Sequence, residues 1–547
     1  MKKNKFLEGA MISTIGIVIC KIIGLIYVIP FYAIIGKQGG TLYSYAYSIY
    51  AIFLSLSTSG IPIAMSKVVS EYNALGYYYT KEKAYKIGSK FIMLMGFVFF
   101  LLLMIFAPHI ASLIIGDMQG GNTIEGVAFV IRIVSTALLI VPLLSVTKGY
   151  LQGHKIMTPS SIANILEQLV RVIVIVLGSF VALKVFNLSV ETAVGVAVFA
   201  ATIGAISAYF YVYDKIRKNK NELKRVEKIT REEAKITTKE IISKIVFYAL
   251  PFIAIDLINS LYSMVDTLTV VKTMTNLGYN AVDTETTIGV ISSWATKLNM
   301  IIISIALGLN ISLIPNITSS YVKKDMKDVT KKINQALQML VFIVIPMTIG
   351  IHFLARPVWI SFYGYDKLSI EIFKLFIFQA MTFSFYSVLI NITQALNARR
   401  LTITTLITTF LIKAILNIPF MNLFTKLNIP VYYAPTIVTL LSQVIGIVLL
   451  LYMINKKFKI SYRYSLNTIG KCIISVMIMY MVLLIINLFV PIDSMSRIGS
   501  IFEIILFAII GVIVYGLCTL KSGVIDEIAG KEFVNKILKK IFKKRTH

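Results

Sequence analysis

The residues best suited to chemistry in this chain are cations that fall inside long apolar segments. Once the loops are assigned, seven of the 54 Lys and Arg residues lie there: Lys21, Lys67, Arg132, Arg171, Lys297, Lys374 and Lys413. A fixed cation in hydrocarbon costs roughly 2.5–3.5 kcal/mol on insertion scales, so such a side chain normally faces a protein interior or a watery cavity. The pattern therefore predicts an internal cationic surface that holds an anion.

Depth within the segment separates these cations into two groups. Four lie near the middle, too deep to reach the headgroups easily, and we expect them to face a cavity: Lys21, Arg171, Lys297 and Lys413. The other three lie near segment ends, where a long side chain that reaches the headgroups is the default explanation: Lys67, Arg132 and Lys374. Arg171 also has a structural alternative, because Glu167 is four residues earlier on the same helix face and could neutralise it.

Two acids share the seventh apolar segment. Asp256 and Asp266 could each bind a coupling cation or pair with a cavity lysine. The alternative is a purely structural lysine–aspartate lock between helices. The sequence leaves both interpretations open.

Catalytic and metal-binding groupings are missing from the sequence. The three cysteines (Cys20, Cys472, Cys518) lie in apolar segments without metal-ligand spacing, and the four histidines are scattered. The chain has no Gly-rich nucleotide cradle and no Ser/His/Asp or paired-carboxylate constellation. We therefore expect no enzyme, no cofactor and no metal. A transporter needs none of these.

The elements that must position these residues are membrane-spanning helices. Hydrophobic residues make up 57% of the 547 residues and charged residues only 15%. Apolar runs of 18 or more residues can each cross the roughly 30 Å hydrocarbon layer as a helix. We assign fourteen spans: 9–36, 41–66, 88–115, 127–149, 160–183, 192–213, 241–271, 286–314, 333–355, 369–396, 402–421, 432–454, 469–490 and 498–520. The fold class expected is an all-α integral membrane protein.

The loop charges predict the orientation. Alternate loops and the two terminal segments carry 40 Lys and Arg residues on one side of the membrane and seven on the other. The positive-inside rule therefore places both termini in the cytoplasm. The net charge of +28 sits in short loops and not on a folded basic face, which excludes nucleic acid as a partner and favours anionic lipids of the cytoplasmic leaflet.

A basic segment divides the chain into two similar parts. We expect an N-lobe at 1–213, a cytoplasmic linker at 214–244, a C-lobe at 245–454, an appended helix pair at 455–520 and a basic tail at 521–547. Gly60-Ile61-Pro62 is echoed six spans later by Leu313-Ile314-Pro315. An offset of six spans preserves orientation, so the sequence predicts parallel repeats with a site at their interface.

Several ordered motifs run along the chain: Gly9 to Gly16, Cys20-Lys21-Ile22-Ile23-Gly24, Gly39-Gly40-Thr41-Leu42-Tyr43-Ser44-Tyr45, Gly60-Ile61-Pro62, Gly149-Tyr150-Leu151-Gln152-Gly153-His154, Glu167-Gln168-Leu169-Val170-Arg171 and Ala295-Thr296-Lys297-Leu298. These motifs resemble those of the MurJ/SpoVB branch of the MOP exporter superfamily, and within it the Gram-positive group. Each motif is modest, but their order and spacing are specific, and together they cover nearly the whole chain.

This resemblance implies a fold, a substrate and a set of binding residues. It implies two six-helix lobes in a V, with spans thirteen and fourteen forming a groove for a polyprenyl tail. It further implies a flippase that moves undecaprenyl-diphosphate-linked peptidoglycan precursor (lipid II) between leaflets by alternating access, with cell-wall synthesis proteins as possible partners in the bacterial plasma membrane. The family's cavity cations fall on Lys21, Lys67 and Lys297, where lysine gives a point charge and not the bidentate contact of arginine.

The resemblance also has gaps and rivals. A family arginine falls on Tyr27 and the adjacent aspartate on Val28, so Arg132 and Arg171 would have to compensate. Another undecaprenyl-linked glycan (teichoic, capsule or sporulation) is an alternative substrate. A multidrug exporter of the same fold would need an acidic cavity, and a non-transporting scaffold would not need the cations. For energy, we expect the membrane potential to drive transport, with sodium or proton coupling through Asp256 and Asp266 as the alternative.

Overall fold

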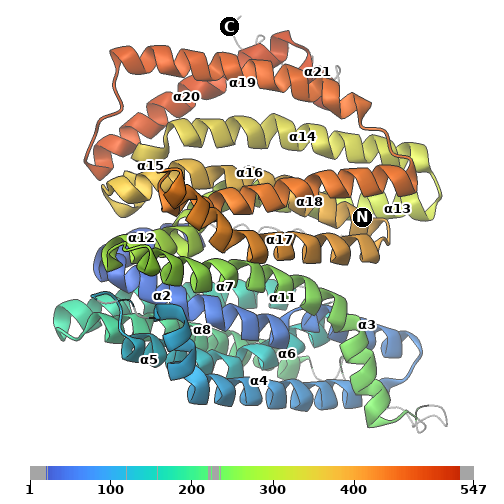
Figure 1. Cartoon of the computed structure of the whole chain (residues 1–547). Helices are drawn as coiled ribbons and strands as arrows, with labels where there is room; N and C mark the ends of the chain where they lie inside the picture. The colour runs from blue at the N-terminus through green and yellow to red at the C-terminus, as the bar shows by residue number, and fades with distance from the viewer. Residues whose placement is uncertain are drawn as a thin grey trace, which may run out of the picture. The chain divides into compact units, whose positions relative to one another are not determined.

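The computed structural model describes residues 20, 23–116, 118, 120–154, 156, 158–219, 223, 233 and 236–529. Lys21 and the basic tail beyond residue 529 lie outside the described residues. The chain forms two compact units, Met1–Ser293 and Trp294–His547, which we describe separately. The regular elements of the described ranges are all helices (Figure 1).

Thirteen helices in the described part of the chain are long and apolar enough to cross a membrane. Residues 9–19, 21 and 22 of the first predicted span, 9–36, lie outside the described residues. The prediction of an all-helical membrane protein with about fourteen spans is therefore confirmed.

The first unit contains the spans that carry most of the predicted cations. Its helices are α2 (Val28–Thr58), α3 (Ile61–Ala74), α4 (Tyr78–Ile115), α5 (Ile124–Ser135), η1 (Thr136–Leu139), α6 (Val141–Gly153), α7 (Thr158–Ile173), η2 (Val174–Gly178), η3 (Val181–Val185), α8 (Val190–Lys218), α11 (Thr238–Asn276) and α12 (Ala281–Gly289), with η4 (Val290–Trp294) at its end. Helix α11 packs on α2, α3 and α4. The predicted division of the chain into two lobes joined by a linker at 214–244 remains a prediction.

A glycine sets the break between α2 and α3. Gly60 has a φ of +71°, a left-handed conformation that favours glycine, and Pro62 then begins α3 in the first turn, where its missing N–H costs nothing. A Cβ on Gly60 would lie 2.6 Å from Cβ of Phe252 and 2.9 Å from the carbonyl oxygen of Ala249. Gly60 therefore allows both the turn and the close approach of α11.

The second unit carries the remaining spans. Its helices are α13 (Ala295–Val322), α14 (Met326–Phe353), α15 (Ala355–Tyr363), α16 (Lys367–Ala395), α17 (Arg399–Lys426), η5 (Val431–Tyr433), α18 (Ala434–Phe458), α19 (Arg463–Phe489), α20 (Arg497–Lys521) and α21 (Val524–Ala529). Within this unit α14 packs against both α13 and α19, and α19 packs against α20 (Figure 1). Large apolar side chains are exposed on α19 and α20, as expected for helices that face lipid.

Candidate functional site

The glycines of the Gly149–His154 motif bring α6 onto α3. A Cβ on Gly149 would lie 2.6 Å from the carbonyl oxygen of Pro62, and one on Gly153 would lie 2.6 Å from Cβ of Val69. The hydroxyl of Ser70 donates to the Gly153 carbonyl at 2.8 Å. Small residues four apart let two membrane helices approach closely. This motif therefore fixes α3, which carries Lys67, against α6, which carries Lys148.

The other motif residues hold this contact in place. The Tyr150 hydroxyl donates a short hydrogen bond to the Glu82 carboxylate, and its ring packs 4.3 Å from that of Tyr85. His154 ends the helix, with Nδ1 2.9 Å from the Tyr150 carbonyl oxygen. Burial lowers the pKa of His154 below its ordinary 6.5, so the ring is neutral at pH 7. The motif therefore serves to pack α6 against α3 and α4.

A shared carboxylate joins two cations at the centre of this unit. Glu167 accepts from Arg171 Nη2 at 2.8 Å through one oxygen and from Lys148 Nζ at 3.1 Å through the other. The side chain of Glu167 is 17% exposed, that of Arg171 22% and that of Lys148 12%, so the group is largely buried. The cluster Lys148–Glu167–Arg171 carries a net charge of +1. The predicted pairing of Glu167 with Arg171 is present in the structure.

The surroundings of Arg171 are aromatic and tight. Tyr47, Tyr50 and Tyr43 of α2 lie within electrostatic range of its guanidinium. Across α8, a Cβ on Gly204 would lie 2.7 Å from the Glu167 carbonyl oxygen and 3.3 Å from Cβ of Arg171. The Nε of Arg171 is buried and has no hydrogen-bond acceptor in the described part of the chain. A cation in this setting retains a donor that an anionic ligand could use.

Sequence reasoning missed Lys148 as a member of this cluster. Lys148 falls at the end of the predicted span 127–149 and is not among the seven cations assigned to spans, but α6 extends to Gly153, so Lys148 lies inside the helix. The available signal is its position directly before Gly149, the first residue of the Gly149–His154 motif. Lys148 also donates to Asn164 Oδ1 at 2.7 Å, which ties α6 to α7.

Lys67 lies exposed on α3, with its ammonium 4.0 Å from the ring centroid of Tyr248 on α11. One turn further along α3, Glu71 accepts from Lys244 at 2.7 Å and from Tyr248 at 3.3 Å. The cation–π contact stabilises a charge without neutralising it. Lys67 therefore remains able to bind an anion.

Arg132 and Lys374 are both exposed and have specific neighbours. Arg132 Nε donates to the Met104 carbonyl at 3.2 Å. The backbone carbonyl oxygen of Lys374 lies 2.9 Å from Nδ1 of His352, and the Lys374 ammonium takes no part in that contact. The structure does not group these two cations with the Lys148–Glu167–Arg171 cluster.

The cavity-facing position expected of Lys413 is wrong. Its side chain is fully buried between α17 and α18, where Nζ donates to the Pro435 carbonyl at 2.8 Å and to the Thr439 hydroxyl at 2.7 Å. A buried ammonium needs such oxygens in place of water. Lys413 therefore joins two helices of the second unit.

The remaining candidates are divided between the two units. Lys297 is half-buried on α13 of the second unit. Asp256 is exposed and Asp266 half-buried on α11 of the first unit. The part of the chain that the structure describes contains no cluster of three His, Cys, Asp or Glu residues able to hold a metal ion.

A family model described as polysaccharide biosynthesis protein matches residues 6–321, more than half of the chain. The chain belongs to this family. Lipid II flippase MurJ of Bacillus subtilis (strain 168) is 35% identical over 425 residues, which cover 77% of this chain and 78% of that protein. The predicted resemblance to the MurJ/SpoVB branch is thereby confirmed, and the chain is a multi-pass membrane protein.

Two solved structures share the fold of this family member. Lipid II flippase MurJ in an inward closed conformation matches with a TM-score of 0.66 and 16% identity, covering 94% of this chain and 99% of that one. An inward-facing multidrug resistance MATE family transporter of the MOP superfamily matches with a TM-score of 0.62 and 13% identity, covering 82% and 99%. At these identities the likeness shows the fold alone, so the substrate must be argued from side chains.

Proposed function

We propose that this protein is a flippase that moves lipid II from the inner to the outer leaflet of the bacterial cell membrane by alternating access. The 35% identity to the lipid II flippase of Bacillus subtilis carries the proposal. A flippase forms and breaks no covalent bond in its substrate, so the protein is not an enzyme. The loop charges support a cytoplasmic position for both termini.

Cations on the spans supply the affinity for the diphosphate. Lys67 and the cluster Lys148–Glu167–Arg171 contribute three positive charges and one negative charge in the first unit, and Lys297 adds another cation in the second. A diphosphate entering a low-dielectric region loses its hydration, and fixed cations replace that hydration. In this mechanism the substrate phosphate takes over the position of the Glu167 carboxylate and uses the free Nε donor of Arg171. Lys21 belongs to the same set by its motif.

The same charges disfavour the multidrug alternative. An exporter of organic cations needs carboxylates that are free to bind them, whereas Glu167 already bridges two cations. Flippases of other undecaprenyl-linked glycans share the diphosphate and would use the same residues. These rivals differ in the lipid intermediate that accumulates when the protein is depleted.

The membrane potential is the proposed energy source. Moving one charge across 100 mV is worth about 2.3 kcal/mol, and an inside-negative potential draws an empty cationic cavity toward the cytoplasm. Coupling of sodium or protons through Asp256 and Asp266 is the alternative. Flipping in liposomes under an imposed potential, with ion gradients clamped, separates the two sources, and indifference to voltage rules out the first.

The function is tested by replacing the native flippase in a depleted strain. Wild-type protein should restore growth and prevent accumulation of lipid II, and Arg171→Gln and Lys67→Gln should fail at normal membrane levels. If lipid II turnover continues unchanged when the protein is depleted, the lipid II assignment is wrong and another glycan is the substrate.

A double variant separates binding from structure at the buried cluster. Glu167→Gln with Arg171→Gln removes one charge of each sign and leaves no unpaired carboxylate. A purely structural ion pair predicts that this variant recovers activity relative to Arg171→Gln alone. Diphosphate binding by Arg171 predicts that it inserts normally but remains inactive. Recovery of flipping would therefore contradict the role assigned to Arg171.

A further inference from the structure

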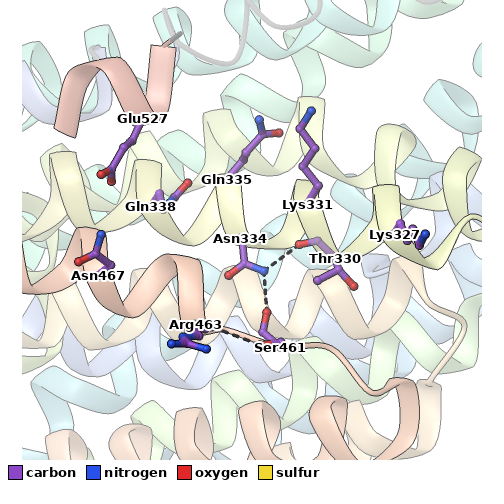
Figure 2. Close-up of a pocket in the computed structure, with 10 residues that line it drawn as sticks. All are labelled: Lys327, Thr330, Lys331, Asn334, Gln335, Gln338, Ser461, Arg463, Asn467 and Glu527. Carbon is purple, nitrogen blue, oxygen red and sulfur yellow. Dashed lines mark hydrogen bonds between the residues drawn. The ribbon is translucent and has the colours of Figure 1, made fainter. Parts of the chain in front are cut away.

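A polar cavity of about 1170 Å³ lies in the second unit, at the beginning of α14 and α19 and beside α21 (Figure 2). The α14 wall is one helix face, because its lining residues recur at intervals of three and four: Lys327, Thr330, Lys331, Asn334, Gln335 and Gln338. Ser461, Arg463 and Asn467 line the α19 side, and Glu527 comes from α21. None of these residues belongs to the cationic sites described above.

The floor of this cavity is rigid. Asn334 is 3% exposed and donates to the carbonyl oxygens of Thr330 at 2.9 Å and Ser461 at 2.8 Å, while its own oxygen accepts from Ser465 Oγ at 2.6 Å. Gln338, also buried, donates to Thr468 Oγ1 at 2.8 Å. Because these amides are fixed, the positions of α14 and α19 on either side of the cavity are fixed as well.

The rim of the cavity is positively charged. Lys327, Lys331 and Arg463 are exposed, and none of them is ion-paired with an acid among the described residues. The one acid of the lining, Glu527, is already bound by Lys471 and by Thr468 Oγ1. Asp328 lies within electrostatic range of Lys331, but its carboxylate is already bound by Lys332 and the Ser320 hydroxyl. The three lining cations therefore have no carboxylate in direct contact in the described part of the chain. Such a site fits a phosphate-bearing anion.

An apolar stripe on α19 continues from this rim. Arg463 and Asn467 are followed on the same helix face by Gly470, Ile474, Met477 and Met481. The last three are 60%, 62% and 57% exposed, and a Cβ on Gly470 would meet nothing within 4 Å. This arrangement fits a ligand whose anionic head binds in the cavity and whose apolar chain lies along the exposed apolar side chains of α19.

The segment that follows α21 does not supply the anion. The segment after α21, residues 530–547, contains seven Lys and Arg residues and a single Glu, so it would be repelled by the rim. The segments around the connections α13–α14 and α18–α19, residues 321–332 and 455–471, carry five Lys and Arg residues each, so the positive-inside rule assigns the site to the cytoplasmic leaflet. That leaflet is rich in anionic lipid.

We propose that this cavity binds the phosphate headgroup of an anionic phospholipid from the cytoplasmic leaflet, with the acyl chain lying along the α19 stripe. The site is separate from the cations assigned to flipping, so it holds a resident or regulatory lipid. Bound there, the lipid bridges α14 and α19 through its phosphate and so links the appended helix pair to the rest of the second unit.

The test uses the purified full-length chain in detergent, delipidated and then titrated with phosphatidylglycerol or with zwitterionic phosphatidylcholine. Native mass spectrometry gives a dissociation constant for each lipid. Lys331→Gln with Arg463→Gln should weaken phosphatidylglycerol binding roughly 25-fold, because each cation near a lipid surface contributes about fivefold. Phosphatidylcholine should bind more weakly to the wild type and change little in the variant.

A matched control has the same change in charge outside the cavity. Lys426→Gln with Lys521→Gln alters two exposed lysines of the same unit and should leave phosphatidylglycerol binding within about twofold of wild type. Equal loss in the control, or equal binding of the two lipids by wild type, overturns the proposal. Inorganic pyrophosphate that displaces the lipid at equal concentration overturns it in favour of a soluble phosphate. Binding is measured without transport, so this result is independent of whether lipid II is the substrate.

Discussion

The Nε of Arg132 donates to the backbone carbonyl of Met104 at 3.2 Å, and Met104 lies four residues before Pro108, a proline inside α4. Proline has no N–H, so it leaves the carbonyl at position i−4 without its helical hydrogen bond. Inside a membrane no water is available to replace that bond. Arg132 therefore completes the backbone of α4, a role that the position of a cation near a span end does not reveal.

This relationship predicts that the two residues are coupled. Arg132→Gln alone should lower the stability of the protein in detergent by about 1 kcal/mol, because the Met104 carbonyl loses its donor. Pro108→Ala restores the helical N–H, and in that background Arg132→Gln should cost much less. Thermal unfolding of the four proteins measures the coupling. An equal cost in both backgrounds would show that Arg132 does not act through this carbonyl.

The close contact between α3 and α6 predicts a strong effect of adding one methyl group. Gly149→Ala places a Cβ 2.6 Å from the Pro62 carbonyl oxygen and 2.9 Å from Cβ of Met65. Overpacking of this kind typically costs about 1–3 kcal/mol, so the yield of folded protein and the unfolding temperature should both fall. Gly516→Ala in α20 is the control, since nothing lies within 4 Å of its Cβ. A similar loss in the two variants would contradict the packing argument.

The sequence predicted the class of fold because apolar length and loop charge are properties of single segments. It also predicted the pairing of Glu167 with Arg171, which follows from helical spacing alone. Lys148 was missed because its membership depends on where α6 ends and on how α6 packs against α7. Lys413 was misassigned for a similar reason, since depth in a span does not tell which oxygens of a neighbouring helix surround the ammonium.

The cavity between α14 and α19 could not be predicted from the sequence at all. Its cations lie at the beginnings of α14 and α19, more than 120 residues apart in the sequence, and each basic segment alone looks like an ordinary cytoplasmic connection. What distinguishes the site is the contact of Asn334 with Ser461 and Ser465, which is tertiary. The number of Lys and Arg residues in the loops predicts on which side of the membrane the site lies, but the cavity itself depends on how α14 packs against α19.

The structural role of Lys413 predicts that its charge is dispensable. Lys413→Met keeps the length of the side chain, and Thr439 retains its own hydrogen bond to the Pro435 carbonyl at 2.8 Å. Replacement of a buried charge by an apolar side chain of similar volume is often neutral, so stability should change by less than about 1.5 kcal/mol. Growth complementation should remain at the wild-type level. Loss of flipping by a correctly folded Lys413→Met protein would show that this ammonium serves transport after all.

The neutral ring of His154 predicts a loss of stability in acid. Burial lowers its pKa below the ordinary 6.5, and nearby Lys81 adds to this effect while the Tyr150 carbonyl and Glu82 partly oppose it. The unfolded chain therefore binds this proton more readily than the folded chain, so the contribution of His154 is present above pH 6.5 and is lost as the pH falls below it.

The change can reach at most about 1.4 kcal/mol per pH unit for one group. Unfolding temperatures of wild type and His154→Asn, measured from pH 8 to pH 5, isolate the effect from the other three histidines. The wild type should lose stability more steeply than His154→Asn below pH 6.5, because asparagine cannot take up the proton that strains the contact between α6 and α4. Parallel curves for the two proteins would mean that His154 is not held neutral by its surroundings.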